Sequence, residues 1–187
     1  MTQTLRILVI LGSVREGRVA EPVGNWVMEQ GQTRADLALE PVDLKDWNLP
    51  PYPFPKPPAM GGYTDPLQIA WAEKIGAADG YILIAPEYNH GIPAALKNAL
   101  DFVYAEWHRK PVAFVGYGGS GGARSIEGLT QVARSLKMAA LEATVHIMGV
   151  NGKIAAGRFT GEERDVKSLA HLFDELSWWG SALKAAR

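Results

Sequence analysis

The chain has 187 residues, 47% of them apolar, which is enough to bury the core of one domain without metals or disulfides. The 19 basic and 20 acidic residues leave a formal net charge of -1, which argues against nucleic acid or an anionic membrane as partner and favours a small molecule. There is no cysteine, which excludes disulfides, thiol nucleophiles and cysteine-held metal sites, so any redox chemistry must come from a bound cofactor.

The apolar run at the N-terminus is too short for a membrane span and lacks the flanks of a signal peptide. We therefore expect a cytoplasmic protein that does not enter a membrane. Neither repeats nor a linker divide the chain, so residues 1–187 are expected to form a single domain.

Apolar runs alternate with helix-period segments, which predicts an α/β fold with a mainly parallel sheet and helices on both faces. Leu5–Leu11 and residues 81–85 are almost continuously apolar, as expected for neighbouring central strands covered on both faces. A strand over residues 37–42 contains Pro41, which suits an edge position. The other two strands are expected over residues 112–115 and 143–148.

Helices are predicted where apolar residues recur at helical spacing and make one buried face. Thr160 and Glu163 have capping-box spacing, and they open a closing helix that runs through Phe173. The three other helical faces consist of Val19, Val23, Trp26 and Val27, of Leu96, Ala99, Leu100 and Val103, and of Ile126, Leu129, Val132 and Ala133.

Residues 50–58 interrupt this alternation with six prolines, which hold the chain near polyproline II geometry. We interpret the segment as a loop that crosses the surface after the second strand, in preference to a cap over a substrate cleft. Trp107, Trp178 and Trp179 are expected to be core or subunit-contact residues.

Ligands of open α/β sheets bind outside the carboxyl ends of the strands, so the loops after the first, third and fourth strands are the candidate site. The first loop, residues 12–18, combines Gly12, Ser13, Arg15 and Arg18 just before a helix N-terminus at Val19 and Ala20. Backbone N–H groups, a hydroxyl and a guanidinium there favour a phosphate. A glycine turn with two solvated arginines remains the alternative.

The second loop, residues 86–93, is bracketed by prolines and contains Pro86, Glu87, Tyr88 and Asn89. A stiff polar segment of this kind is suited to laying N–H donors against the edge of a planar heterocycle. For His90 we favour a structural or rim role, because no substrate proton is in evidence for a catalytic one. No catalytic side chain is therefore assigned.

The third loop, residues 116–124, formally matches the dinucleotide fingerprint G-x-G-x-x-G but follows the fourth strand instead of the first. We interpret its glycines, including Gly118 and Gly119 before Ser120, as close backbone approach to a flat ligand, with Tyr117 stacking on it or lying at its rim. The histidines show no metal-ligand spacing, and no G-x-S-x-G elbow or Walker pattern is present.

With these motifs the sequence resembles the NADPH-dependent FMN reductase family of flavodoxin-like proteins, which includes flavin, quinone, azo-dye and chromate reductases. The resemblance covers most of the chain. It implies a flavodoxin-like fold with a five-stranded parallel sheet of order 2-1-3-4-5. It also implies FMN with its phosphate in the first loop, its ring edge along Pro86 to Asn89 and its far side near Tyr117 to Gly119, and hydride transfer from NADPH or NADH to flavin N5.

Members of the family also pair, so the resemblance implies a homo-oligomer, either a dimer or a dimer of dimers. The chain departs from the family pattern after Arg15, where many members have a hydroxyl residue that helps to hold the phosphate; Arg18 is the expected substitute.

Two other functions compete with a reductase. A flavodoxin-type electron carrier is disfavoured because such carriers are expected to be strongly acidic, unlike a chain of net charge -1. A non-redox nucleotide-binding module would purify colourless. The sequence leaves the acceptor open among free flavin, a quinone, an azo compound and a metal oxyanion.

Overall fold

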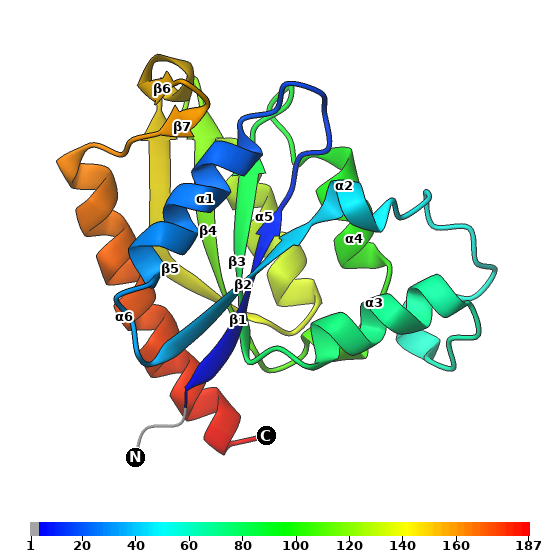
Figure 1. Ribbon diagram of the computed structural model, residues 1–187. Helices are drawn as coiled ribbons and strands as arrows, with labels where there is room; N and C mark the ends of the chain where they lie inside the picture. Colours follow the sequence, from blue (N-terminus) through cyan, green and yellow to red (C-terminus); the bar gives the residue numbers. More distant parts are fainter. Residues whose placement is uncertain (1–3) are drawn as a thin grey trace.

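The computed structural model describes residues 4–187, which contain a five-stranded parallel sheet of order β2-β1-β3-β4-β5 (Figure 1). This confirms the predicted flavodoxin-like order. The central strands β1 and β3 are buried along almost their whole length, because their continuous apolar runs meet helices on both faces. The strands are β1 (Leu5–Leu11), β2 (Leu37–Asp43), β3 (Gly80–Pro86), β4 (Pro111–Gly118) and β5 (Ala139–Met148).

The strand β2 lies at one edge of the sheet, as the proline in it predicted. Pro41 pairs in register with Val9 of β1 and is exposed on the outer side, where a missing N–H breaks no ladder. The strands β4 and β5 are longer than predicted and contain a register shift between Val112 and Phe114. The added residues include Pro111, Gly116 and Gly118 of β4 and Ala139, Ala140 and Glu142 of β5, which are of types depleted in strands.

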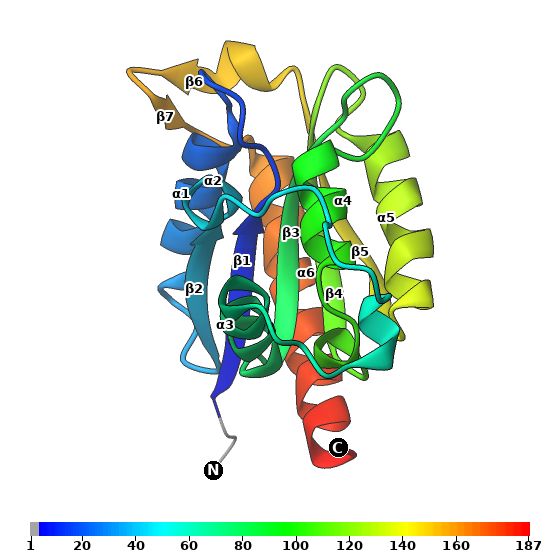
Figure 2. The same cartoon turned by 90° about the vertical axis from the view of Figure 1, so that its right-hand side faces the viewer.

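Two apolar cores lie on opposite faces of the sheet. One contains α1 (Ala20–Gly31) and α6 (Glu163–Ala185), and the other contains α3 (Pro66–Gly76), α4 (Ala94–Asp101) and α5 (Ala123–Ser135). Figure 2 shows the sheet between these two layers. Strand residues alternate between the cores, so that Val9 packs under α1 and Ile10 faces the opposite layer.

The helix α3 was not predicted, although its start carries a recognisable signal. Pro66 occupies its first turn, and the Asp65 carboxylate accepts a hydrogen bond from the Gln68 N–H at 2.9 Å. Its Trp71 is fully buried beside Trp107, which is also in the core as expected. Trp178 and Trp179 are not in the core of this chain, since both are exposed on α6.

The predicted Thr160 capping box is wrong. The helix α6 begins at Glu163 with Glu162 as its N-cap, and the reciprocal box pairs Glu162 with Asp165. Thr160 still belongs to the end of a small hairpin, made of β6 (Ile154–Ala155) and β7 (Arg158–Phe159), where its N–H donates to the Lys153 carbonyl at 3.1 Å. That hairpin was also not predicted. It packs Phe159 against α1, so the helix α6 begins only after it.

Residues 50–58 form a surface segment, as predicted, between α2 (Leu44–Trp47) and the short 3-10 helix η1 (Pro58–Met60). The segment is anchored to α4, because the Tyr52 N–H donates to the Asn98 side chain at 3.0 Å. Phe54 packs edge-on against Phe102. Two further 3-10 helices are η2 (Ala105–Trp107) and η3 (Val150–Lys153).

No helix among residues 4–187 is both long and apolar enough to cross a membrane.

Candidate functional site

The first, second and third loops leave the sheet at the same edge, because β1, β3 and β4 are parallel neighbours. In Figure 1 they lie at the top of the molecule. Pro86 ends β3 opposite Tyr117 of β4, and Leu11 ends β1 opposite Ile84. The three segments singled out from the sequence are therefore brought together by the sheet.

Gly12 allows the first loop to leave β1 close to the neighbouring elements. A Cβ at this position would lie 2.7 Å from Leu96 Cδ2 and 2.9 Å from the Ile84 carbonyl oxygen, both too close. The Gly12 N–H donates to that same carbonyl at 2.9 Å. Gly12 thus serves packing between β1, β3 and α4, and positions the loop that follows.

The first loop offers several backbone donors that have no backbone partner in the part of the chain that the structure describes. No backbone N–H of residues 13–17 donates to a backbone carbonyl of residues 4–187. The helix α1 follows with half-buried Val19 as its N-cap, no side-chain cap, and buried Ala20 as its first residue. The exposed Arg15 guanidinium donates only within its own loop, to the Glu16 carbonyl at 3.0 Å. Unpaired N–H groups at a helix N-terminus beside an exposed guanidinium favour an anion.

Arg18, by contrast, is engaged inside the protein. Its guanidinium forms a two-pronged salt bridge with Asp43 at the end of β2 and donates to the Ser13 carbonyl at 2.8 Å. Burial pushes the pKa of Asp43 upward, but hydrogen bonds from Arg18 and the Lys45 N–H hold it below its usual value. The geometry gives Arg18 a role in holding the first loop, and direct phosphate contact by Arg18 stays a prediction.

The second loop is held to the first and third by polar contacts. The hydroxyls of Tyr88 and Ser13 lie 2.7 Å apart and share a hydrogen bond. Glu87 accepts from the Arg124 N–H at 3.0 Å and from its guanidinium at 2.8 Å, at the start of α5. Burial pushes the pKa of Glu87 upward, but the bonds from Arg124 hold it below its usual value. The relative position of the three loops is thus set before any ligand binds.

Asn89 and His90 form the tip of the second loop. Their φ angles are 49° and 65°, and Tyr88 and Gly91 exchange hydrogen bonds of 3.1 and 3.0 Å across them, as in a tight type I′-like turn. Both side chains are exposed. His90 is therefore exposed in a turn, and its structural or rim role stays a prediction.

Glycines shape the third loop in two different ways. A Cβ at Gly116 would lie 2.5 Å from the Gly121 carbonyl oxygen, so this position must remain small for the loop to fold back. Gly118, with φ of 137°, and Gly119 would instead project a Cβ into open space. The exposed Ser120 hydroxyl accepts from the Arg124 guanidinium at 3.3 Å. The surface at Gly118 and Gly119 is bare backbone that a flat ligand can approach.

Tyr117 does not lie at the rim of the site, because only 4% of the residue is exposed. Its hydroxyl is buried without a hydrogen-bond partner among the described residues, a situation that costs about 1–3 kcal/mol. Burial raises the pKa of this hydroxyl above its usual value, and the nearby Tyr88 adds to the shift. Ser13, Arg15 and Arg18 of the first loop oppose this rise in the pKa.

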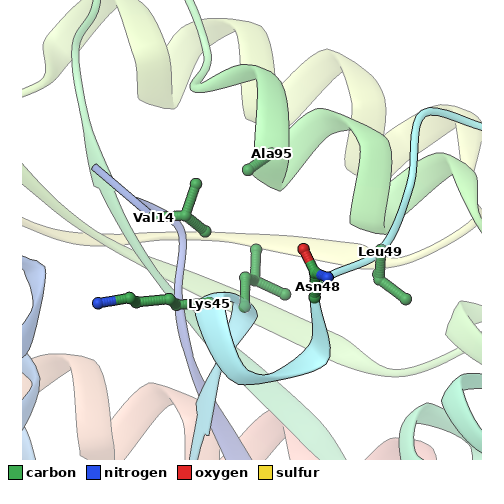
Figure 3. A pocket seen from close by; sticks show the side chains of 6 residues that line it. Val14, Lys45, Asn48, Leu49 and Ala95 are labelled. Atoms are coloured by element: carbon green, nitrogen blue, oxygen red, sulfur yellow. The ribbon is translucent and has the colours of Figure 1, made fainter. Parts of the chain in front are cut away.

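Two hollows adjoin the first loop from opposite sides. One, of about 230 Å³, lies between the first loop, α2 and the start of α4 (Figure 3) and is lined by Val14, Leu44, Lys45, Asn48, Leu49 and Ala95. The other, of about 480 Å³, lies between α1 and the β6–β7 hairpin. Neither is lined by residues of the second or third loop, whose Tyr88, Asn89, Gly119 and Ser120 are exposed.

The sequence interpretation missed two residues that organise the site, Asp43 and the side chain of Arg124. A signal existed for each of them. Asp43 ends a strand parallel to β1, so it reaches the same edge, and Arg124 opens the helix that follows the third loop. Their partners could not be chosen from the sequence, because each pairing joins segments distant along the chain.

The model of the NADPH-dependent FMN reductase family matches residues 5–152. Over 137 residues the chain is 46% identical to an NAD(P)H-dependent FMN reductase of Schizosaccharomyces pombe, with 72% of this chain and 68% of that protein covered. It is 27% identical to a quinone reductase of Escherichia coli K12, with 100% of both chains covered. The solved structure of FerB, a flavoenzyme NAD(P)H:(acceptor) oxidoreductase from Paracoccus denitrificans, superposes with a TM-score of 0.76 at 23% identity, covering 96% of this chain and 98% of that one. This last likeness concerns the fold.

Proposed function

The chain belongs to the family of NADPH-dependent FMN reductases, and on this premise we propose how its residues serve the reaction. It is an FMN-dependent oxidoreductase that uses NADPH or NADH to reduce a small acceptor of quinone type. In this proposal residues 1–187 act as one FMN-binding domain. The observation that carries it is the set of unpaired donors at one sheet edge, where polar contacts already join the three loops.

The residues present fit FMN. Anion donors gather in the first loop, an unpaired buried hydroxyl points to a missing partner, and bare backbone at Gly118 and Gly119 leaves room for a flat ring. Ser13 and Arg15 would hold the phosphate, and Pro86 to Asn89 would lie along the ring edge. When bound, FMN supplies hydride acceptance from the nicotinamide and electron delivery to the acceptor.

In this proposal the protein orients the cofactor, and no side chain acts as an acid or base in the hydride step. The Arg18–Asp43 pair holds the Ser13 carbonyl and with it the curvature of the first loop. The Glu87–Arg124 pair ties the second loop to the start of α5. Both pairs keep the donors in place, so less ordering is required when FMN binds.

The proposal includes a homo-oligomer, either a dimer or a dimer of dimers. It is supported by the open surface at the second and third loops, which a second subunit would wall, and by the exposed Trp178 and Trp179 of α6. Sedimentation equilibrium of the purified protein tests it, and a monomer at micromolar concentration contradicts it. The cytoplasmic location remains a prediction from the sequence.

An anaerobic titration tests the function. Protein reconstituted with FMN should show a bound flavin band that bleaches on addition of NADPH and returns when a quinone is added. Binding without bleaching by NADPH or NADH would indicate an electron carrier instead. Absence of FMN binding would rule out both interpretations.

A further inference from the structure

We propose that the Tyr117 hydroxyl is a donor to the flavin phosphate and makes the chain select FMN over riboflavin. The inference rests on the proposed function and changes the role of Tyr117 from ring stacking to recognition of the anionic end. Its starting point is the buried hydroxyl on β4 that has no partner among the described residues. A buried polar group without a partner in the chain is expected to have one in the complex.

The surroundings of the hydroxyl identify the partner as an anion. Tyr117 shares an apolar core with Val19 and Ala20, which begin α1 after the first loop, and the charges of Arg15 and Arg18 oppose the rise in the pKa of its hydroxyl. The Ser13 hydroxyl is already bonded to Tyr88 at 2.7 Å, and the N–H groups of residues 14–17 donate to no backbone carbonyl among residues 4–187. Donors converge there from two strands, and among the parts of FMN only the phosphate has several acceptor oxygens and full negative charge.

A second buried tyrosine shows what a purely structural hydroxyl looks like in this protein. The hydroxyl of Tyr81, on the adjacent strand β3, donates a hydrogen bond to the Ile75 carbonyl at 2.9 Å and accepts one from the Lys110 ammonium at 3.1 Å. Its hydrogen-bonding capacity is used within the chain. Tyr117 is buried to nearly the same degree, yet its hydroxyl makes no such bond. Burial alone therefore does not explain the hydroxyl of Tyr117.

The Tyr117→Phe variant tests the inference, because it removes the hydroxyl and keeps the ring. Without FMN its Tm should stay equal to that of the wild type or rise by roughly 2–4 °C, since an unpaired buried polar group is lost. Its affinity for FMN should fall about tenfold, the usual loss for a hydrogen bond to a charged group. Its affinity for riboflavin, measured by the same fluorescence titration, should stay within about twofold.

Tyr81→Phe is the matched control, and it should behave in the opposite way. Its Tm without FMN should fall by roughly 2–4 °C, and its affinities for FMN and riboflavin should not change. The inference is overturned if Tyr117→Phe binds FMN as tightly as the wild type, or if FMN and riboflavin are weakened equally. Neither the Tm nor the flavin affinity requires turnover. Failure of NADPH to bleach the flavin would therefore overturn the reductase function without affecting the test of the Tyr117 hydroxyl.

Discussion

Tyr81 and Tyr117 lie on adjacent strands of the sheet, both buried, but at opposite ends of it. At the amino end, Tyr81 joins a cluster whose polar atoms are paired, with the Lys110 ammonium bonded to the carbonyls of Ile75 and Gly76 at 2.9 Å each. At the carboxyl end, the hydroxyl of Tyr117 has no hydrogen-bond partner among residues 4–187, and the N–H groups of residues 13–17 donate to no backbone carbonyl of that range. The polar groups around Tyr81 stabilise the fold, whereas the Tyr117 hydroxyl and the N–H groups of residues 13–17 are available to a ligand.

This comparison predicts that substitutions at the two ends affect different quantities. Changes at the amino end should lower the free energy of unfolding and leave FMN binding alone. Changes at the carboxyl end should weaken FMN binding with little effect on the protein without FMN. An exception is expected at a residue of the carboxyl end whose close packing determines the conformation of a loop. A substitution there should affect both stability and FMN binding.

Gly116→Ala is that exception and should have the largest effect. Its Cβ would lie 2.5 Å from the Gly121 carbonyl oxygen, so the third loop must move. We expect the free energy of unfolding to fall by about 3–4 kcal/mol and FMN binding to be lost, because overpacking at backbone cannot relax cheaply. Urea unfolding and flavin titration measure the two effects. Gly119→Ala is the control, and it should change stability by no more than about 0.5 kcal/mol, since nothing lies within 4 Å of its Cβ.

Asp79→Ala should have the next largest effect, at the amino end. The Asp79 carboxylate accepts from the Lys184 ammonium at 2.7 Å, the Arg187 guanidinium at 3.1 Å and the Arg6 N–H at 3.0 Å. Its removal leaves these donors unpaired and should cost about 2–3 kcal/mol of unfolding free energy, somewhat less than for a fully buried pair. FMN affinity should stay unchanged. A loss of affinity without a loss of stability would refute the division between the two ends.

Arg15→Ala should produce the reverse pattern. The exposed guanidinium stabilises nothing beyond its own loop, so the Tm without FMN should not change. The Kd for FMN should rise about thirtyfold if Arg15 forms a charge-assisted bond to the phosphate. Arg164→Ala on α6 controls for the loss of one positive charge. An unchanged Kd would remove the phosphate role that we assign to Arg15.

The smallest expected effect concerns pH. Burial lowers the pKa of Lys110 from 10.5 to about 8, so between these values the unfolded chain binds a proton that the folded chain does not. Stability should therefore increase as pH rises through this range. From pH 8 to pH 10 the wild type should gain about 1–2 kcal/mol of unfolding free energy relative to Lys110→Met, as measured by urea unfolding. Parallel pH profiles of the two proteins would show that Lys110 does not titrate in this range.

The sequence by itself determined the sheet and the three loops that meet at the carboxyl ends of its strands. Continuous apolar runs such as Leu5–Leu11 identified the central strands, and Pro41 identified the edge strand. The loops after three parallel strands had to meet at the carboxyl ends of those strands. The residues of those loops also carried the family resemblance, which the family match over residues 5–152 confirmed. The strands could be identified from local sequence, because the apolar pattern of a strand indicates which of its faces are buried.

Only the tertiary structure decided which polar groups are already paired. Arg18 pairs with Asp43 because the register of β1 and β2 aligns Leu11 with Asp43. The helix α6 begins after Thr160, because the Thr160 N–H is hydrogen-bonded within the β6–β7 hairpin. The sequence allowed Tyr117 to lie at the rim of the site, whereas the structure buries it on β4. A hydrogen bond between distant segments depends on sheet register to within one residue, and the composition of a single loop carries no record of that register.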